Sequence, residues 1–218
     1  MSWETGSQIP RKNEYISNED LLKKKGFLEE REAKLLFYEF LRNNTTFATD
    51  LITGVQLFPF QHMAIKSMLE SDYFLGVWSR GMSKSYTTGI YAVLDAILNQ
   101  GVETGILSRS FRQSKMIFKK IEDIAAKPEA YLLKQCITHV SKSNDEWVME
   151  IGKSRIRALP LGDGEKLRGF RFHRIIIDEF LLMPERIYNE VIVPFLSVVQ
   201  NPTQREELYQ AENNLIKQ

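Results

Sequence analysis

The sequence has few of the residues that would hold a fold together by covalent or metal bonds. It contains one cysteine, Cys136, and three histidines in 218 residues. A single cysteine forms no internal disulfide and no zinc site, and the histidines are scattered without the short spacings of metal ligands. No apolar run approaches the roughly 20 residues of a membrane helix, and the polar first 30 residues do not resemble a signal peptide. We therefore expect a soluble, intracellular protein without a membrane partner.

An excess of charge of one sign is also missing. The chain has 29 Lys and Arg against 28 Asp and Glu, a net charge of +1. This leaves a nucleic-acid partner open, because such binding depends on a local basic patch. Residues 153–174 hold seven basic and two acidic residues (7 − 2 = +5), and a second basic stretch holds Arg109, Arg112, Lys115, Lys119 and Lys120. Either stretch is a candidate for contacts with a DNA backbone, or is simply a solvated face.

Short apolar segments alternate with helical periodicity along most of the chain. Strands are predicted over 73–79, 104–108 and 174–177, a hairpin over 147–151 and 156–161, and helices over 59–70, 85–99, 110–126, 185–200 and 202–217. This alternation predicts an α/β fold with a mainly parallel central sheet flanked by helices. Further helices are predicted from Ser17 and over 29–42. We therefore divide the chain into a helical N-terminal segment, 1–54, and a domain of residues 55–218.

The segment Trp78-Ser-Arg-Gly-Met-Ser-Lys-Ser85 follows a predicted strand and opens a predicted helix. This arrangement is typical of a phosphate-binding loop, in which backbone N–H groups and a helix N-terminus hold phosphates. Lys84 would reach the β- and γ-phosphates, and the Ser85 hydroxyl would hold Mg²⁺. The match to G-x-x-x-x-G-K-[ST] is imperfect, because Trp78 and Ser83 stand where that pattern has glycine. Alone, the segment also fits a plain strand–turn–helix junction.

Two carboxylates follow the apolar segment Arg174-Ile-Ile-Ile-Asp-Glu179. A buried strand of this kind delivers acids to the carboxyl edge of a sheet, where open α/β folds bind ligands. Asp178 would hold Mg²⁺ and Glu179 would polarise an attacking water, unless both are solvated acids at a strand end. The pair follows the phosphate loop by 94 residues (178 − 84), with another strand–helix unit between them. This order favours a nucleoside triphosphatase.

Four segments in this order resemble the ATPase domain of the large terminase subunit of tailed bacteriophages, the motor that pumps DNA into procapsids. They are Leu57–Gln61, Ser79–Ser85, Leu107–Lys115 and Leu167–Glu179. The second begins with Ser-Arg, as the terminase variant of the phosphate loop does, which accounts for Trp78 at the first glycine position. The resemblance covers roughly residues 55–200. It implies a P-loop NTPase fold of the ASCE type, with ATP and Mg²⁺ as cofactors.

The resemblance also implies a role for each residue that matches a motif. Gln61 would read the adenine base, Glu179 would activate water, and Ser85 with Asp178 would hold Mg²⁺. Arg80 in cis or Arg168 in trans would serve as the arginine finger. Seven consecutive residues would hold the phosphates: Ser79, Arg80, Gly81, Met82, Ser83, Lys84 and Ser85. Ser83 departs from the family's usual glycine, and this departure would weaken nucleotide binding.

The implied partners are double-stranded DNA, the portal protein and the small terminase subunit. The implied assembly is a homo-oligomeric ring on the portal, or a monomer in isolation, in the cytoplasm of the infected bacterium at the procapsid portal. Neither a Ser/Thr coupling motif nor a nuclease domain follows Glu179, so we expect an ATPase-domain fragment without nuclease activity. A helicase-type DNA-translocating ATPase is an alternative, since it shares these motifs. A partner-binding domain that no longer hydrolyses ATP is another.

Overall fold

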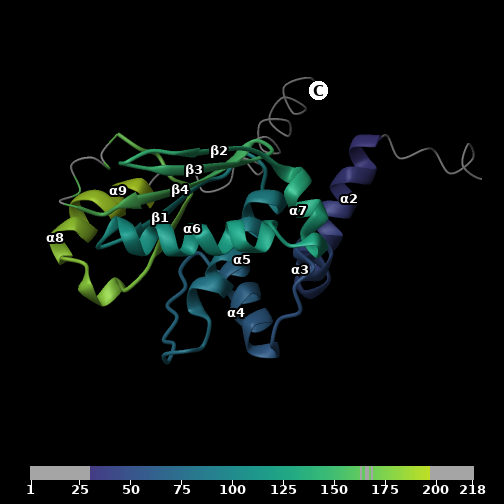
Figure 1. Cartoon of the computed structure of the whole chain (residues 1–218), viewed down its shortest axis with the longest axis horizontal. Coiled ribbons are helices and arrows are strands. Elements are labelled where there is room, and N and C mark those ends of the chain that lie inside the picture. Colours follow the sequence, from purple (N-terminus) through teal and green to yellow (C-terminus); the bar gives the residue numbers. More distant parts are fainter. Residues whose placement is uncertain (1–29, 163, 165–166, 168, 197–218) are drawn as a thin grey trace, which may run out of the picture. The chain divides into compact units, whose positions relative to one another are not determined.

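The structure is a computed structural model, and it describes residues 30–162, 164, 167 and 169–196 (Figure 1). The chain forms two compact units, residues 1–40 and 41–218. Helix α2 (Glu30–Asn43) begins in the first unit, and it confirms the helix predicted over 29–42. The sheet and the predicted site residues that are described belong to the second unit.

Three helices precede the sheet in the second unit. They are α3 (Thr45–Thr53), α4 (Pro59–Glu70) and α5 (Lys84–Leu98). Helices α4 and α5 were predicted, with Pro59 at the first helical position, where its missing N–H costs nothing. Helix α3 was not predicted, because its threonines have low helical propensity. It forms because Ala48 and Ile52 are buried where α3 packs on α5 and α7 (Tyr131–Cys136).

Five strands form one sheet in the order β2-β3-β4-β1-β5. Their bounds are β1 (Glu103–Ser108), β2 (Ile137–Lys142), β3 (Trp147–Ile151), β4 (Ser154–Pro160) and β5 (Arg174–Ile177). Strand β1 pairs in parallel with β4 and β5, whereas β2, β3 and β4 pair antiparallel. The predicted hairpin is confirmed, but the prediction of a mainly parallel sheet is wrong: the sheet is mixed. The hairpin extends into a meander, because β2 adds a third antiparallel strand.

Helix α6 (Phe111–Ala125) connects β1 to the meander, followed by the short helices η1 (Pro128–Ala130) and α7. After β5 come η3 (Phe180–Leu182), α8 (Glu185–Ile187), the π-helical turn η4 (Tyr188–Ile192) and α9 (Val193–Leu196). The helix predicted over 185–200 is therefore interrupted within its described part. Those predicted from Ser17 and over 202–217 lie outside the described residues. No described helix is long and apolar enough to cross a membrane.

The core lies on both faces of the sheet. Ile106 and Leu107 are neighbours in β1, and both are fully buried. Because successive side chains of a strand point to opposite faces of the sheet, both faces are covered at β1. Helices α5 and α6 pack on the strands, as Figure 1 shows for α6 below the sheet. A second apolar cluster joins Leu107 and Leu159 to Phe172 and to residues of α8 through α9. Strand β1 therefore lies between two apolar layers, and Ile175 and Ile177 of β5 pack against the second.

The apolar segment 73–79 ahead of the predicted phosphate loop is not a strand, and that prediction is wrong. Leu75 and Val77 are 76% and 95% exposed. A strand exists only when a neighbour pairs with it, and among the described strands β5 pairs on one side only, with β1. An apolar run in the sequence does not show whether a paired neighbour is present.

Candidate nucleotide-binding site

The predicted phosphate loop and the predicted acidic strand meet in space. Lys84, the first residue of α5, places its Nζ 2.6 Å from Oδ1 of Asp178, which directly follows β5. The meeting follows from topology, because β5 runs parallel to β1 and delivers its carboxyl end to the edge where ligands bind in α/β folds. Residues 94 positions apart in sequence (178 − 84) thus form one site.

A second ion pair joins the other ends of the same two elements. Arg174, at the start of β5, places its Nε 3.6 Å from Oδ2 of Asp95, near the end of α5. Asn99 donates a hydrogen bond of 2.7 Å to the other carboxylate oxygen of Asp95. Burial raises the pKa of Asp95, and the Arg174 guanidinium opposes that shift. Helix α5 is therefore fixed antiparallel to β5 at both ends, which holds the loop at the sheet edge.

The loop itself is a tight turn that leads into α5. The Ser79 carbonyl accepts a hydrogen bond of 3.4 Å from the Met82 N–H, and Gly81 has a φ of 87°, which favours glycine. Ser83 caps α5, and its carbonyl accepts from the N–H groups of Tyr86 and Thr87. Amide N–H groups of a first helical turn face out of the helix end. They and the helix dipole suit an anion in front of Ser83.

Backbone strain is concentrated at this site. Among the described residues, only two non-glycine residues have a positive φ, Ser83 at 54° and Glu179 at 57°. The first belongs to the predicted phosphate loop and the second is the predicted catalytic carboxylate. Such conformations cost energy, and they cluster at functional sites. The position where the phosphate-loop pattern has glycine is thus one where the chain needs a left-handed residue.

Gln113 is a site residue to which sequence reasoning gave no role. Its Nε2 donates a hydrogen bond of 2.5 Å to Oε2 of Glu179, and its Oε1 accepts from the backbone N–H of Ser110. It is the third residue of α6, in a capping box with Ser110. The capping pattern after β1 is the signal that could have found it, because the adjacent parallel strands β1 and β5 end at one edge. Gln113 therefore orients the Glu179 carboxylate.

Gln61, predicted to read adenine, is 3% exposed and faces the interior. Its Oε1 accepts a hydrogen bond of 2.9 Å from the Phe58 N–H, and its Nε2 donates one of 3.0 Å to the Thr87 hydroxyl. The amide of Gln61 thus joins the start of α4 to α5. Arg80 is exposed in the turn, Ser85 is partly buried in the first turn of α5, and Arg168 lies outside the described residues.

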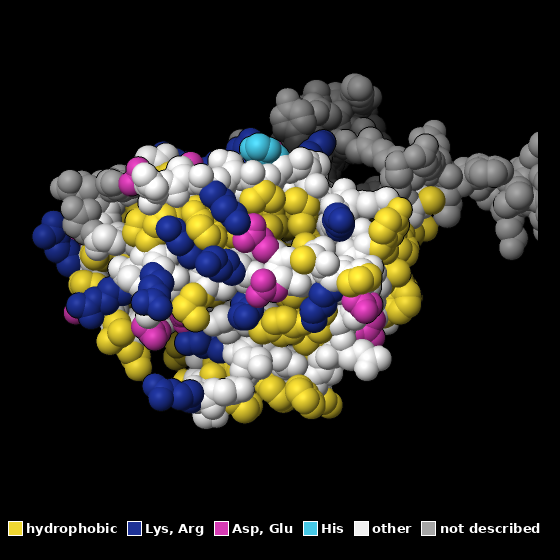
Figure 2. Space-filling view, viewed as in Figure 1, with side chains coloured by type: hydrophobic (Ala, Val, Ile, Leu, Met, Phe, Trp, Pro, Cys, Tyr) yellow, Lys and Arg dark blue, Asp and Glu magenta, His cyan; other side chains and the backbone are white. Residues whose placement is uncertain are grey.

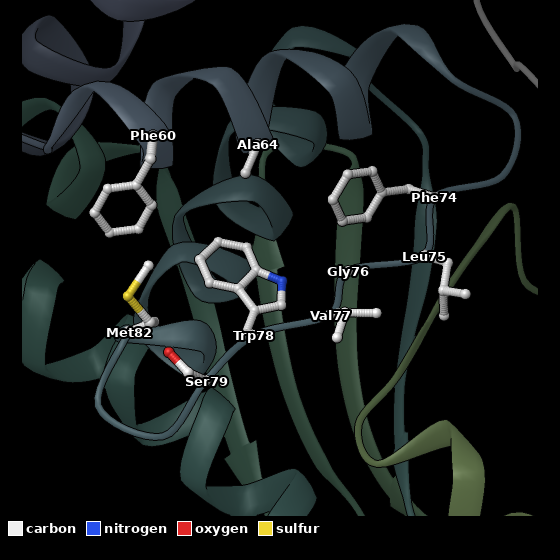
Figure 3. Close-up of a pocket in the computed structure, with 9 residues that line it drawn as sticks. All are labelled: Phe60, Ala64, Phe74, Leu75, Gly76, Val77, Trp78, Ser79 and Met82. Carbon is white, nitrogen blue, oxygen red and sulfur yellow. The ribbon is translucent and has the colours of Figure 1, made fainter.

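An open apolar cavity of about 510 Å³ lies beside the phosphate loop. Figure 3 shows the rings of Phe60, Phe74 and Trp78 with Ala64 of α4 and Met82 of the loop. Phe60 and Trp78 meet edge to face, with ring centroids 6.1 Å apart. Ligand sites of proteins are commonly of this size and lined by aromatic groups. The cavity offers a nucleotide base an apolar surface next to the groups that suit its phosphates.

The two basic stretches differ in how their charges are used. In the first, the Arg155 guanidinium pairs with Glu103 and Glu150, and that of Arg157 with Glu103 and Glu146. These acids offset much of the positive charge of β4.

In the second stretch, Lys115 and Lys119 of α6 lie 5.0 and 5.9 Å from the ring centroid of Trp147. Neither forms an ion pair with an acid within the described part of the chain. Lys142 also lies over this ring and pairs with Glu122. Figure 2 shows Lys and Arg side chains gathered on the face that carries α6.

The donor set fits Mg²⁺ bound together with phosphates. Mg²⁺ is usually held by one or two protein oxygens, with phosphates and waters completing an octahedron. Asp178 and Ser85 offer a carboxylate and a hydroxyl at the sheet edge and at the start of α5. No group of three or more acidic, His or Cys residues that could hold a metal occurs in the described ranges. A metal here would therefore depend on the nucleotide for its remaining ligands.

Comparison with solved structures finds this fold in a phage protein. The Thermus phage P74-26 large terminase ATPase domain matches 68% of this chain and 63% of its own length, with 18% identity and a TM-score of 0.54. A point mutant of that domain matches 68% and 64%, with 17% identity and a TM-score of 0.53. No family model and no curated protein matches the sequence. The chain spans less than two thirds of either structure, and the likeness confirms an α/β fold with a mixed sheet flanked by helices.

Proposed function

We propose that this chain, which has the fold of a phage large terminase ATPase domain, hydrolyses ATP to move double-stranded DNA into a procapsid. One observation carries the proposal: the 2.6 Å contact between Lys84 and Asp178 joins the two motifs of a P-loop ATPase at one sheet edge. A strand–turn–helix junction with a solvated lysine would not require this contact. The strain at Ser83 and Glu179 supports the same site.

In the proposed reaction the loop holds the triphosphate and Glu179 prepares the water. Residues 79–85 surround the phosphates, with Lys84 neutralising the β- and γ-oxygens. Bound by Asp178 and Ser85, Mg²⁺ would neutralise charge on the β- and γ-phosphates. Glu179 accepts a hydrogen bond from the attacking water and draws the water's proton toward its carboxylate. Gln113 fixes the direction from which that carboxylate acts.

Charge that develops on the γ-phosphate requires a further cation, because the single charge of Lys84 is divided between the β- and γ-phosphates. Arg80 is exposed in the loop and is the candidate in cis. Arg168 is the candidate in trans, which would complete the site of a neighbouring copy in a ring. An arginine finger supplied in this way typically raises turnover by about 10³–10⁵.

The proposed partners follow from the same motor role. Double-stranded DNA would contact Lys115 and Lys119 of α6, whose charges are not offset by described acids. The portal protein and the small terminase subunit are the further partners proposed, at the procapsid portal in the infected cell. A helicase-type motor would use the same site, and a strand-separation assay on forked DNA distinguishes the two.

Calorimetry with Mg²⁺-ATP tests the proposal directly. We expect saturable binding by the unmodified chain, loss of binding in Lys84→Ala, and binding without hydrolysis in Glu179→Gln. Turnover per subunit should rise with protein concentration if a neighbouring copy supplies the finger. Absence of binding at millimolar ATP would refute the ATPase and favour a partner-binding domain. The apolar segment 73–77, exposed beside the loop, is the surface that such a domain would offer.

A further inference from the structure

We infer that Gln61 positions the phosphate loop through Thr87 and does not read the nucleotide base. The inference rests on the proposed function, since it assigns how one residue of that site acts. It starts from the burial of both side chains: Gln61 is 3% exposed and Thr87 is fully buried. A base could reach the Gln61 amide only if this side chain left its buried position.

The direction of each hydrogen bond in this chain of groups is fixed. The Phe58 backbone N–H can only donate, so the atom of Gln61 that faces it at 2.9 Å is the carbonyl oxygen. The amide nitrogen of Gln61 therefore faces Thr87 and donates to its hydroxyl at 3.0 Å. The Thr87 hydroxyl in turn donates its one proton to the Ser83 carbonyl at 3.2 Å. No member can reverse without breaking the first bond.

The chain of bonds ends on the residue that shapes the loop. The Ser83 carbonyl accepts three hydrogen bonds: from the Tyr86 N–H at 3.1 Å, the Thr87 N–H at 3.0 Å and the Thr87 hydroxyl. Because a trans peptide is planar, a carbonyl directed into α5 turns the N–H of the next residue, Lys84, out of the helix end. The third donor stabilises this orientation although Ser83 is left-handed, at φ 54°. Gln61 thereby helps to aim a phosphate-binding N–H.

The nucleotide base would then contact the apolar cavity beside the loop and not Gln61. Its rings, Phe60, Phe74 and Trp78, offer faces on which any base can stack. Loss of the Gln61 amide should therefore weaken every ligand that carries a triphosphate, whatever its base. Loss of a base-reading amide would instead weaken the adenine nucleotide alone.

The test measures binding of ATP, GTP and inorganic tripolyphosphate, each with Mg²⁺, by calorimetry on the full chain. Gln61→Leu and Thr87→Val remove one link each with little change of volume, and Thr87→Ser keeps the hydroxyl. Thr49→Val is the matched control, because Thr49 is equally buried and bonds the carbonyl four residues before it, in α3. Circular dichroism of each variant verifies that it folds.

We expect Gln61→Leu and Thr87→Val to weaken all three ligands by one common factor, about five- to tenfold for one lost hydrogen bond. Thr87→Ser and Thr49→Val should bind as the unmodified chain does. A loss confined to ATP in Gln61→Leu would overturn the inference and restore a base-reading glutamine. No binding of any ligand by the unmodified chain would overturn the proposed function, and this inference with it.

Discussion

Lys84 and Asp178 form an ion pair of 2.6 Å that closes the gap between the phosphate loop and the end of β5. The lysine is therefore held where a triphosphate would lie, and the carboxylate where a phosphate-bound cation would lie. A nucleotide with its metal must replace this contact by two others, lysine to phosphate and carboxylate to metal. In the proposed function, nucleotide binding and its metal dependence would thus be coupled through one pair of side chains.

Asp178→Asn should separate nucleotide binding from metal dependence. The substitution removes the ion pair and frees Lys84 for phosphate, so ATP without Mg²⁺ should bind at least as tightly as it does to the unmodified chain. The gain in affinity that Mg²⁺ gives, and hydrolysis, should be lost. Calorimetry with and without Mg²⁺ measures both. Lys66→Ala, which breaks an exposed pair with Glu70 in α4, should change neither.

A Mg²⁺-dependent affinity that survived in Asp178→Asn would place the metal ligand elsewhere.

Gln113→Leu should lower kcat about tenfold and leave KM for ATP nearly unchanged. The bond from Gln113 orients the Glu179 carboxylate, which in the proposed reaction would act on water and not on the bound nucleotide. Steady-state hydrolysis over a range of ATP concentrations separates the two constants. Gln135→Leu is the control, since Gln135 is an exposed glutamine that bonds Tyr131 in α7. An increase in KM without a fall in kcat would show that Gln113 acts on nucleotide binding.

Substitutions of Ser83 should change the free energy of unfolding in a way that reveals its left-handed backbone conformation. A left-handed residue with a side chain costs roughly 1–2 kcal/mol, while glycine adds entropy to the unfolded chain. Ser83→Gly should therefore be as stable as the unmodified chain or up to about 1 kcal/mol more stable, and Ser83→Val should be less stable by at least about 1 kcal/mol. Urea denaturation measures both. A Ser83→Gly chain clearly less stable than the original would contradict the strained conformation.

His173 should make the stability of the fold fall in acid. Burial lowers the pKa of its imidazole below the ordinary 6.5, and Nδ1 accepts a hydrogen bond of 3.0 Å from the Glu103 N–H. The unfolded chain therefore binds this proton at a higher pH than the folded chain does. The stability that the neutral imidazole of His173 contributes to the fold is fully present above about pH 6.5, and it is lost as the pH falls through the pKa of the folded state.

The unfolding free energies of the unmodified chain and of His173→Gln, measured between pH 7.5 and 5, isolate this effect. Glutamine keeps an acceptor for the Glu103 N–H and does not titrate, so the variant should lose less stability in acid. The comparison is needed because the raised pKa of Asp95 acts in the opposite direction, adding stability as the pH falls. Equal pH dependence of the two chains would exclude His173 as a source.

The elements that the sequence predicted well carry their own local signals. Helices α4, α5 and α6 have a proline, a Lys-Ser and a capping box at their starts, and β5 is a run of isoleucines before two acids. The prediction of a strand over 73–79 was wrong because strand formation depends on a partner distant in the sequence. The burial of Gln61 and its bond to Thr87 could not be predicted either, because they arise only when α4 packs on α5.

Lys115 and Lys119 provide the sharpest test of the proposed contact with DNA, because no described acid pairs with them, whereas acids pair with the arginines of β4. Replacing both with alanine should weaken binding to double-stranded DNA and lower the salt slope by about 1.8, if each contacts one phosphate. Arg155→Ala should leave the slope unchanged, because Glu103 and Glu150 already pair with that guanidinium. Fluorescence anisotropy with a labelled duplex, from low to moderate salt, gives the slopes. If Arg155→Ala lowered the slope and the lysine pair did not, the DNA would lie along β4, and its phosphates would have to compete with the carboxylates there.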